Sequence, residues 1–239
     1  MNADEIRQDV IRVAVKNNAG HIAPSLSCVD ILYVLYYYIM EDYDRLIISK
    51  AHGAYGLYSI LADNGIIPKE TWERFGLPGC LERMPEYGIE AGCGALGHGL
   101  PMAVGLAWAL KLRDLPGRVY CLVGDGECQE GTTWEAVQFA KHMNLDNLNI
   151  VIDDNSLQAM DFTGNIISGC LSSRFIGFGL NPVICNGHEH EYLKLGLGIK
   201  QEFRPSVTIC DTIKGYGLPF MMDDPKWHYR IPTENELCM

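Results

Sequence analysis

The chain has 239 residues, of which 48% are apolar and 21% are charged, a composition typical of a folded globular protein. This length suits one sizeable domain, and we expect a single domain over residues 1–239 with extended terminal segments. The formal net charge of −11 argues against a nucleic-acid or anionic-membrane surface, because phosphate groups are bound by clustered lysine and arginine.

A cytoplasmic location is expected from three features. The longest apolar stretch, residues 31–40, is too short to span a bilayer, so no membrane association is expected. The first residues lack the basic start and apolar run of a signal peptide. None of the nine cysteines forms a C-x-x-C pair, which favours reduced, buried thiols over a structural zinc site.

Helical periodicity alternates with short apolar runs along the whole chain. In chain order, we expect helices at 6–17 and 27–40, a strand at 46–48, helices at 54–64 and 102–112, a strand at 118–123, a helix at 134–143, strands at 149–153 and 183–185, a helix at 189–199 and a strand at 206–210. Ser27 followed by Asp30 resembles a capping box that opens the second helix. Apolar strands separated by helices predict a doubly wound, mostly parallel α/β sheet.

The clearest site signal is Gly124-Asp125-Gly126, which directly follows a predicted strand. Ligands bind beyond the carboxyl ends of strands in open α/β sheets, and a helix N-terminus there suits phosphate. A carboxylate would repel phosphate unless a cation such as Mg²⁺ lay between them. Asn155 follows the next strand and would supply an amide oxygen, with the Leu157 carbonyl as another ligand. The alternative for Gly-Asp-Gly alone is an ordinary tight turn.

The same residues carry a resemblance to a known family. Gly124-Asp125-Gly126 with Asn155 resembles the motif of thiamine-diphosphate proteins, which begins with Gly-Asp-Gly and ends with Asn. Further segments resemble transketolase in the same order along the chain: Ala19-Gly20-His21, Ser49-Lys50-Ala51-His52-Gly53, Ala95-Leu96-Gly97-His98-Gly99, Gly124 to Gly131, Thr212 to Gly217 and Pro225-Lys226-Trp227-His228. The resemblance runs from about residue 4 to 237 and covers the amino-terminal, diphosphate-binding half of that family.

This resemblance implies a thiamine-diphosphate-binding fold that holds thiamine diphosphate and Mg²⁺. Asp125, Asn155 and the Leu157 carbonyl would hold the metal, and Gly124 and Gly126 would lie at the diphosphate. Leu96, with Gly94 just before it, would approach the aminopyrimidine.

Four further residues gain roles from the resemblance. His21, His52 and His228 match histidines that line the cofactor and substrate entrance, and we expect them to act in catalysis; the alternative is three structural or surface histidines. Lys214 would face the diphosphate or the channel, with a solvated lysine as the alternative. Asn186-Gly187-His188 resembles the family's D-G-H segment, which suggests a turn rather than chemistry.

The missing half of the family implies a partner. We expect this chain to act with a carboxyl-terminal subunit that carries the pyrimidine-binding domain and its glutamate, in a heterotetramer. The implied reaction moves a two-carbon unit from a ketose or 2-oxo acid donor to an aldehyde acceptor, so the substrates are small sugars or oxo acids. The alternatives are the cofactor-binding subunit of a 2-oxo acid decarboxylase or dehydrogenase, and a non-catalytic regulatory subunit.

Two departures from the family bear on the donor. Met84 stands where a histidine that recognises ketose hydroxyls is usual, and a thioether cannot donate that hydrogen bond. His98 stands where glutamine is usual. These changes favour an apolar, pyruvate-like donor.

Overall fold

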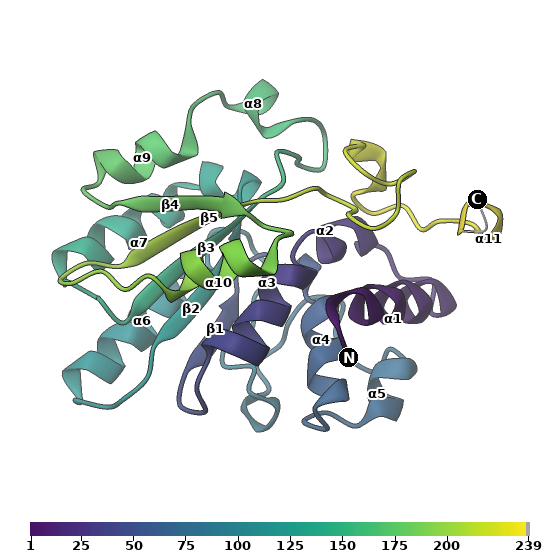
Figure 1. The fold of residues 1–239 in the computed structure, drawn as a ribbon, viewed down its shortest axis with the longest axis horizontal. Helices are drawn as coiled ribbons and strands as arrows, with labels where there is room; N and C mark the ends of the chain where they lie inside the picture. Colours follow the sequence, from purple (N-terminus) through teal and green to yellow (C-terminus); the bar gives the residue numbers. More distant parts are fainter. Residues whose placement is uncertain (238–239) are drawn as a thin grey trace.

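Five parallel strands form the centre of the protein, whose computed structural model describes residues 1–237 (Figure 1). The strands are β1 (Arg45–Ile48), β2 (Val119–Gly124), β3 (Leu148–Asp154), β4 (Pro182–Asn186) and β5 (Ser206–Asp211). They lie in the order β1-β2-β3-β5-β4, and every neighbouring pair is parallel. The doubly wound α/β fold expected from the sequence is therefore confirmed, with all five strands at the predicted places.

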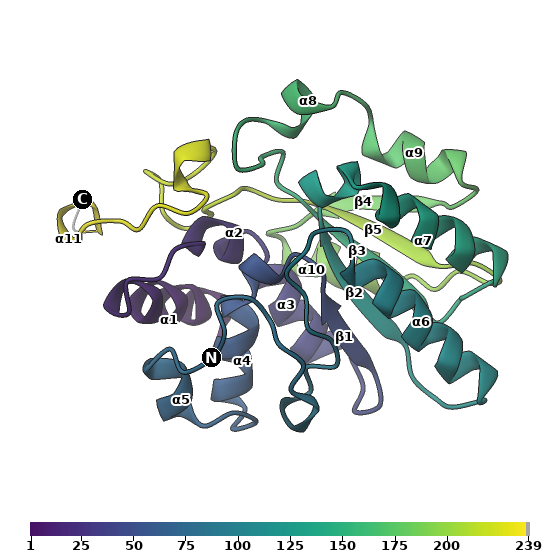
Figure 2. The ribbon, with the colours of Figure 1, turned by 180° about the vertical axis from the view of Figure 1, so that it is seen from behind.

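Helices cover both faces of this sheet. They are α1 (Ala3–Lys16), α2 (Ile22–Leu26), α3 (Val29–Val34), α4 (Tyr55–Asp63), α5 (Lys69–Glu73), α6 (Gly99–Leu112), α7 (Gly131–His142), α8 (Thr163–Ile166), α9 (Leu171–Gly177), α10 (His190–Gly198) and α11 (Glu234–Leu237). Figure 1 shows α3 and α10 in front of the sheet, and Figure 2 shows α6 and α7 over the opposite face. The carboxyl-terminal segment leaves β5 and runs past α2 (Figure 1).

The central strands are buried because their side chains are almost all apolar. Every residue of β2 is buried, as are the first six residues of β3. Burial of each such aliphatic side chain contributes about 1.5–3 kcal/mol, which favours the strand at the centre of the sheet. Asp153 is the charged residue among those six, and it pairs with Lys50 beside the site described below.

The helix expected over residues 27–40 is arranged differently. It consists of α3, which follows Cys28, and a π-helical turn over Leu35–Ile39. The predicted capping box is wrong, because Cys28 rather than Ser27 precedes the first turn of α3 and no described side chain accepts from the N–H groups of that turn. The Ser27 hydroxyl instead donates to Asp153 Oδ2 at 2.7 Å. The Ser27 hydroxyl therefore makes a tertiary contact instead of capping the helix.

Residues Ile22–Ile39 form one helical run that could cross a membrane by length and composition alone, with a mean hydropathy of 1.4. This run is longer than the stretch over residues 31–40 considered from the sequence. Within the fold, 72% of it is buried, as in the core helix of a globular domain. Burial accounts for its apolar character without a membrane.

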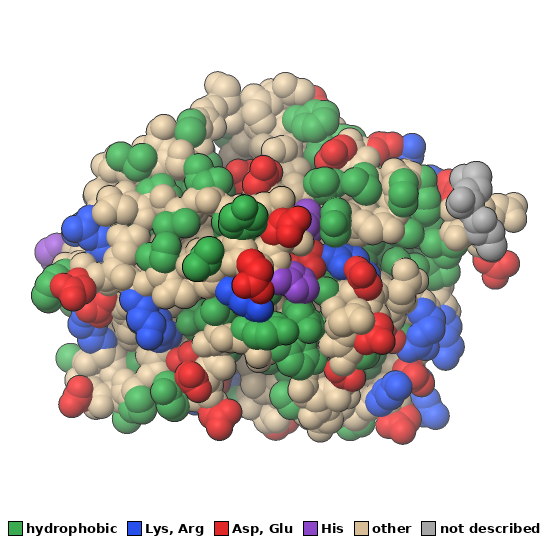
Figure 3. Space-filling model, viewed as in Figure 1, with side chains coloured by type: hydrophobic (Ala, Val, Ile, Leu, Met, Phe, Trp, Pro, Cys, Tyr) green, Lys and Arg blue, Asp and Glu red, His purple; other side chains and the backbone are tan. Residues whose placement is uncertain are grey.

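The surface and the thiols bear on two expectations from composition. On the face seen in Figure 3, basic side chains are scattered among acidic ones and form no continuous patch. The eight cysteines within residues 1–237 are free, and five of them are buried, whereas Cys185 is half-buried and Cys80 and Cys170 are exposed. Cys238 lies outside the described residues. The cytoplasmic location stays a prediction.

The carboxyl ends of the central strands meet at one edge of the sheet. Gly124 at the end of β2 pairs with Asp153 on β3, and Asp154 pairs with Asp211 on β5. The loops that follow these strands therefore start side by side, and they form the candidate site.

Candidate active site

A cavity of about 500 Å³ opens at the carboxyl ends of β2 and β3. Its wall contains all eleven residues nominated from the sequence, namely His21, His52, Gly94, Leu96, Gly124, Asp125, Gly126, Asn155, Leu157, Lys214 and His228. Segments from separate parts of the chain are thus brought together where ligands bind in parallel sheets. The structure places these residues, and their roles stay predictions.

Asp125 follows β2 and is buried, with only 8% of its surface exposed. Its Oδ2 atom has no hydrogen-bond partner. Burial, followed by the charges of Asp153 and Asp154, raises the pKa of Asp125 to about 7. A cation at this position would favour the charged form of Asp125, and Mg²⁺ prefers such oxygen ligands.

Asn155 and Leu157 extend an oxygen-rich set around Asp125. The Asn155 amide is held by a hydrogen bond from Nδ2 to Asp153 at 3.1 Å, while its Oδ1 accepts from the Leu157 N–H at 3.2 Å. One carboxylate, one amide and one carbonyl leave room for phosphate oxygens and water, as is typical of Mg²⁺. No three His, Cys, Asp or Glu residues within residues 1–237 are grouped to hold a metal by themselves. The residues present therefore fit a magnesium ion shared with a phosphate ligand.

Gln158 is a cavity residue that the sequence analysis missed. Its amide nitrogen is buried without a partner. Gln158 also explains why residue 126 is a glycine, because a Cβ at Gly126 would lie 2.8 Å from Gln158 Cγ. Asp125 Oδ2 and the Gln158 amide nitrogen both have no hydrogen-bond partner, and a metal ion with a bound anion would satisfy both. Its only signal in the sequence is its place three residues after Asn155.

The three histidines form a compact triangle. Their ring centroids are 5.3 Å (His21–His52), 5.4 Å (His21–His228) and 5.3 Å (His52–His228) apart. Burial, and then the charge of Lys214, lowers the pKa of His21 and lowers that of His228 to about 3. Burial, and then Lys50, lowers the pKa of His52. All three rings are therefore neutral near pH 7, so each presents one donor and one acceptor nitrogen.

Lys214 belongs to the cavity wall, so the alternative of a solvated lysine is wrong. Only 1% of its surface is exposed. Its Nζ donates to the carbonyls of Leu157 (3.3 Å) and Gln158 (3.1 Å) and to His228 Nδ1 (2.8 Å). Burial, and then the charge of Lys50, lowers the pKa of Lys214 to about 8, which leaves it mostly protonated at pH 7.

Lys50 and Asp153 form a buried ion pair beside the cavity. Asp153 also accepts hydrogen bonds from Ser27, Thr212 and Asn155. The pair ties the segment after β1 to the end of β3 and so supports the floor of the site. Sequence reasoning did not nominate either residue, because their contacts join segments about a hundred positions apart.

Met84 and His98 lie outside the cavity wall. Met84 forms a β-bridge with Ile89, and the exposed His98 ring approaches the carbonyl of Leu96 at 3.1 Å. Cys80, which precedes Met84, lines the cavity instead. Met84 therefore does not line the cavity, and the inference of a pyruvate-like donor loses the contact on which it was based.

The carboxyl edge of this parallel α/β sheet carries an unpartnered carboxylate, a buried lysine and three neutral histidines. A domain of this kind is suited to a diphosphate bound through a metal. A family model described as "Transketolase, thiamine diphosphate binding domain" matches residues 1–236. The chain therefore belongs to the transketolase family, whose members are transferases.

Similar proteins include split and full-length members of this family. The chain is 36% identical to an apulose-4-phosphate transketolase subunit of Actinobacillus succinogenes, covering 98% of this chain and 91% of that protein. It is 32% identical to a 6-deoxy-6-sulfo-D-fructose transketolase subunit of a Clostridium species, covering 91% and 86%. Among solved structures, a transketolase from Campylobacter jejuni matches with a TM-score of 0.90 and 27% identity. The match covers 98% of this chain but only 40% of that longer protein.

Proposed function

We propose that this chain is the thiamine-diphosphate- and Mg²⁺-binding subunit of a split transketolase, which moves a two-carbon unit from a ketose or 2-oxo acid to an aldehyde. The unpartnered, buried Asp125 carboxylate beside Asn155 carries the proposal. The family match over residues 1–236 supports it, since it independently points to thiamine diphosphate.

The cavity offers a defined place for each part of the cofactor. Asp125, Asn155 and the Leu157 carbonyl would hold Mg²⁺, and the Gly126 N–H, Gln158 and Lys214 would meet the diphosphate. Gly94 and Leu96 would lie at the pyrimidine end. When bound, thiamine diphosphate supplies a carbanion that adds to a substrate carbonyl.

The histidine triangle would act on the substrate. Because the rings of His21, His52 and His228 are neutral, each can accept a proton from a substrate hydroxyl or donate one to an oxygen. The Lys214 ammonium bonds to His228 Nδ1, so the proton of that ring is held on Nε2. Lys214 thereby sets which nitrogen of His228 can donate.

A partner protein with the pyrimidine-binding domain would complete the site, in a heterotetramer. The relatives named as transketolase subunits support this. The glutamate that acts on the pyrimidine would come from that partner. The substrates in the names of the relatives, apulose-4-phosphate and 6-deoxy-6-sulfo-D-fructose, support a ketose donor that carries an anionic group.

Metal-dependent cofactor binding tests the proposal. In calorimetric titration of the assembled complex, Asp125→Ala is expected to abolish the Mg²⁺-dependent binding of thiamine diphosphate. Asp161→Ala, at a half-buried position outside the cavity wall, serves as the control and should bind normally. Unchanged, metal-dependent binding by Asp125→Ala would refute the metal assignment.

The alternative of a 2-oxo acid decarboxylase or dehydrogenase component is disfavoured by the relatives, which are named transketolases. A non-catalytic regulatory role is disfavoured because the cavity wall contains every residue nominated from the sequence. Activity of the complex with hydroxypyruvate and an aldehyde, compared with pyruvate, separates these alternatives.

A further inference from the structure

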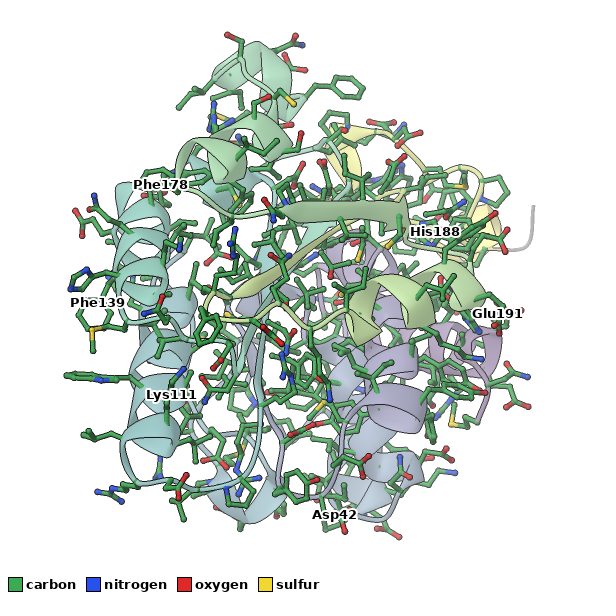
Figure 4. The ribbon with its side chains drawn as sticks, turned by 60° about the vertical axis from the view of Figure 1, so that its left-hand side comes forward. Asp42, Lys111, Phe139, Phe178, His188 and Glu191 are labelled. Atoms are coloured by element: carbon green, nitrogen blue, oxygen red, sulfur yellow. The ribbon has the colours of Figure 1, made fainter. Side chains whose placement is uncertain are left out.

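Behind the cavity wall lies a buried polar cluster that the proposed chemistry does not use. His188 lies in the turn between β4 and α10 (Figure 4). Its Nδ1 donates to Asp30 Oδ2 at 2.8 Å, and only 7% and 3% of the two side chains are exposed. Asp30 also accepts from Arg7 and from His190 Nε2. The sequence indicated only a turn here.

This cluster fixes both the tautomer and the plane of the His188 ring. Burial alone would raise the pKa of Asp30, but the hydrogen bond from His188 and the charge of Arg7 outweigh it and lower the pKa. An ionised Asp30 requires a proton on His188 Nδ1 and so leaves Nε2 as an acceptor. Tyr216 stacks on the ring at 3.5 Å between centroids, and Arg7 lies over Tyr216 at 4.8 Å.

The free nitrogen of His188 bonds to the segment that carries Lys214. The backbone N–H of Ile213 donates to His188 Nε2 at 2.9 Å. The neighbouring N–H groups of Thr212 and Gly215 donate to backbone carbonyls instead. Ile213, directly before Lys214, is therefore held through its backbone N–H by a side chain outside the cavity wall, while the Thr212 hydroxyl donates to Asp153.

The turn that presents His188 is built for this close approach. A Cβ at Gly187 would lie 2.3 Å from Thr212 Cγ2, so only glycine lets the turn lie against the segment. The Gly187 N–H donates to Asp211 at 2.7 Å, and the His188 N–H donates to Asn186 Oδ1 at 2.9 Å.

We infer that His188 is a positioning residue for Lys214: oriented by Asp30, it holds Ile213 and thereby aims the lysine ammonium at the cavity. The inference rests on the proposed function, because its effect is read through thiamine diphosphate. Partners of this kind typically change ligand affinity by about tenfold or more when they are removed.

Two isosteric substitutions separate this role from general packing. In His188→Gln, the amide reaches the position of Nε2 and can still accept from Ile213, whereas in His188→Asn it reaches only the position of Nδ1. On the assembled complex with saturating Mg²⁺, we expect His188→Asn to raise the Kd for thiamine diphosphate roughly tenfold. His188→Gln should stay within about threefold of wild type, although both variants lose thermal stability.

A double-mutant cycle tests whether the effect passes through Lys214. Lys214→Met should itself weaken cofactor binding, and adding His188→Asn should then produce no further change in Kd. If His188→Asn does not fold, Asp30→Asn tests the same role. Without the Asp30 charge the His188 proton is no longer fixed on Nδ1, so the Kd for thiamine diphosphate should also rise.

The outcomes are distinct. If wild-type complex binds the cofactor through Asp125 while His188→Asn binds equally well, the inference is wrong and the proposed function stands. Equal losses in His188→Gln and His188→Asn, or additive effects with Lys214→Met, would show a structural role only and also overturn it. If wild-type complex does not bind thiamine diphosphate, both proposals fail.

Discussion

Asp125 and Lys214 face the same cavity with opposite charges, and they form no ion pair. Asp125 keeps one oxygen free, while Lys214 donates to two carbonyls and to His228. A direct pair would have neutralised the site. Keeping the charges apart leaves a carboxylate for a cation and an ammonium for an anion, which together suit a metal diphosphate.

The low pKa of His228 predicts how stability depends on pH. The pKa of His228 is about 3 in the folded protein, against 6.5 for an unperturbed histidine. The unfolded chain therefore takes up this proton first as the pH falls, so stability is lost from about pH 6.5 toward pH 3. We expect His228→Asn to show a smaller loss of unfolding free energy between pH 7 and pH 4.5, measured by urea denaturation.

The exposed His142 supplies the control for that experiment. His142→Asn should follow the wild-type pH dependence. An identical slope for His228→Asn and wild type would show that His228 is not held neutral in the folded protein.

At the scale of elements, the sequence predicted the strands and helices that have a clear local pattern of apolar residues. β2 and β3 are uniformly buried over six residues, and their positions followed directly. The short helices α5, α8 and α9 were missed, because four to seven residues are too few for a periodic pattern. Motifs at strand ends nominated Gly124 to Gly126 and Asn155, the family resemblance nominated most of the other candidates, and all of them line the cavity.

What the sequence could not predict depends on contacts between distant residues. Ser27 resembled a helix cap, but its hydroxyl is bound by Asp153. Met84 matched a substrate-binding position by its spacing, yet the loop places Cys80 at the cavity. His188 resembled part of a turn, and only the fold shows its bond to Ile213.

The start of α6 provides a prediction about an element. A Cβ at Gly99 would lie 2.4 Å from Ser49 Oγ and 2.5 Å from Ser49 Cα, where α6 meets the end of β1. Gly99→Ala should therefore push the helix from the sheet and cost roughly 1–3 kcal/mol of unfolding free energy. Urea denaturation at 25 °C measures the change.

Gly105 is the matched control, since it lies in the same helix and its Cβ would meet nothing within 4 Å. Gly105→Ala should gain up to about 1 kcal/mol, because alanine favours the helix. Equal effects at the two positions would show that the contact with Ser49 does not position α6.

At the scale of the whole molecule, we propose that the cavity supplies one end of an active site. Its buried acids are already engaged: Asp125 belongs to the proposed metal site, and Glu127 accepts from Ser49, Gly97 and Gly124. Neither is free to act on a pyrimidine ring. That part of the chemistry requires a group from elsewhere, which is why we propose a partner protein.

Activity should therefore depend on that partner. The purified chain alone is expected to show no two-carbon transfer from hydroxypyruvate to an aldehyde, and mixing it with a pyrimidine-domain partner should restore transfer. Release of carbon dioxide and formation of the ketose product measure the reaction. Asp125→Ala provides the control, because this carboxylate is proposed to bind the metal rather than the partner: the variant should co-elute with the partner yet stay inactive. Robust transfer by the chain alone would refute the split arrangement.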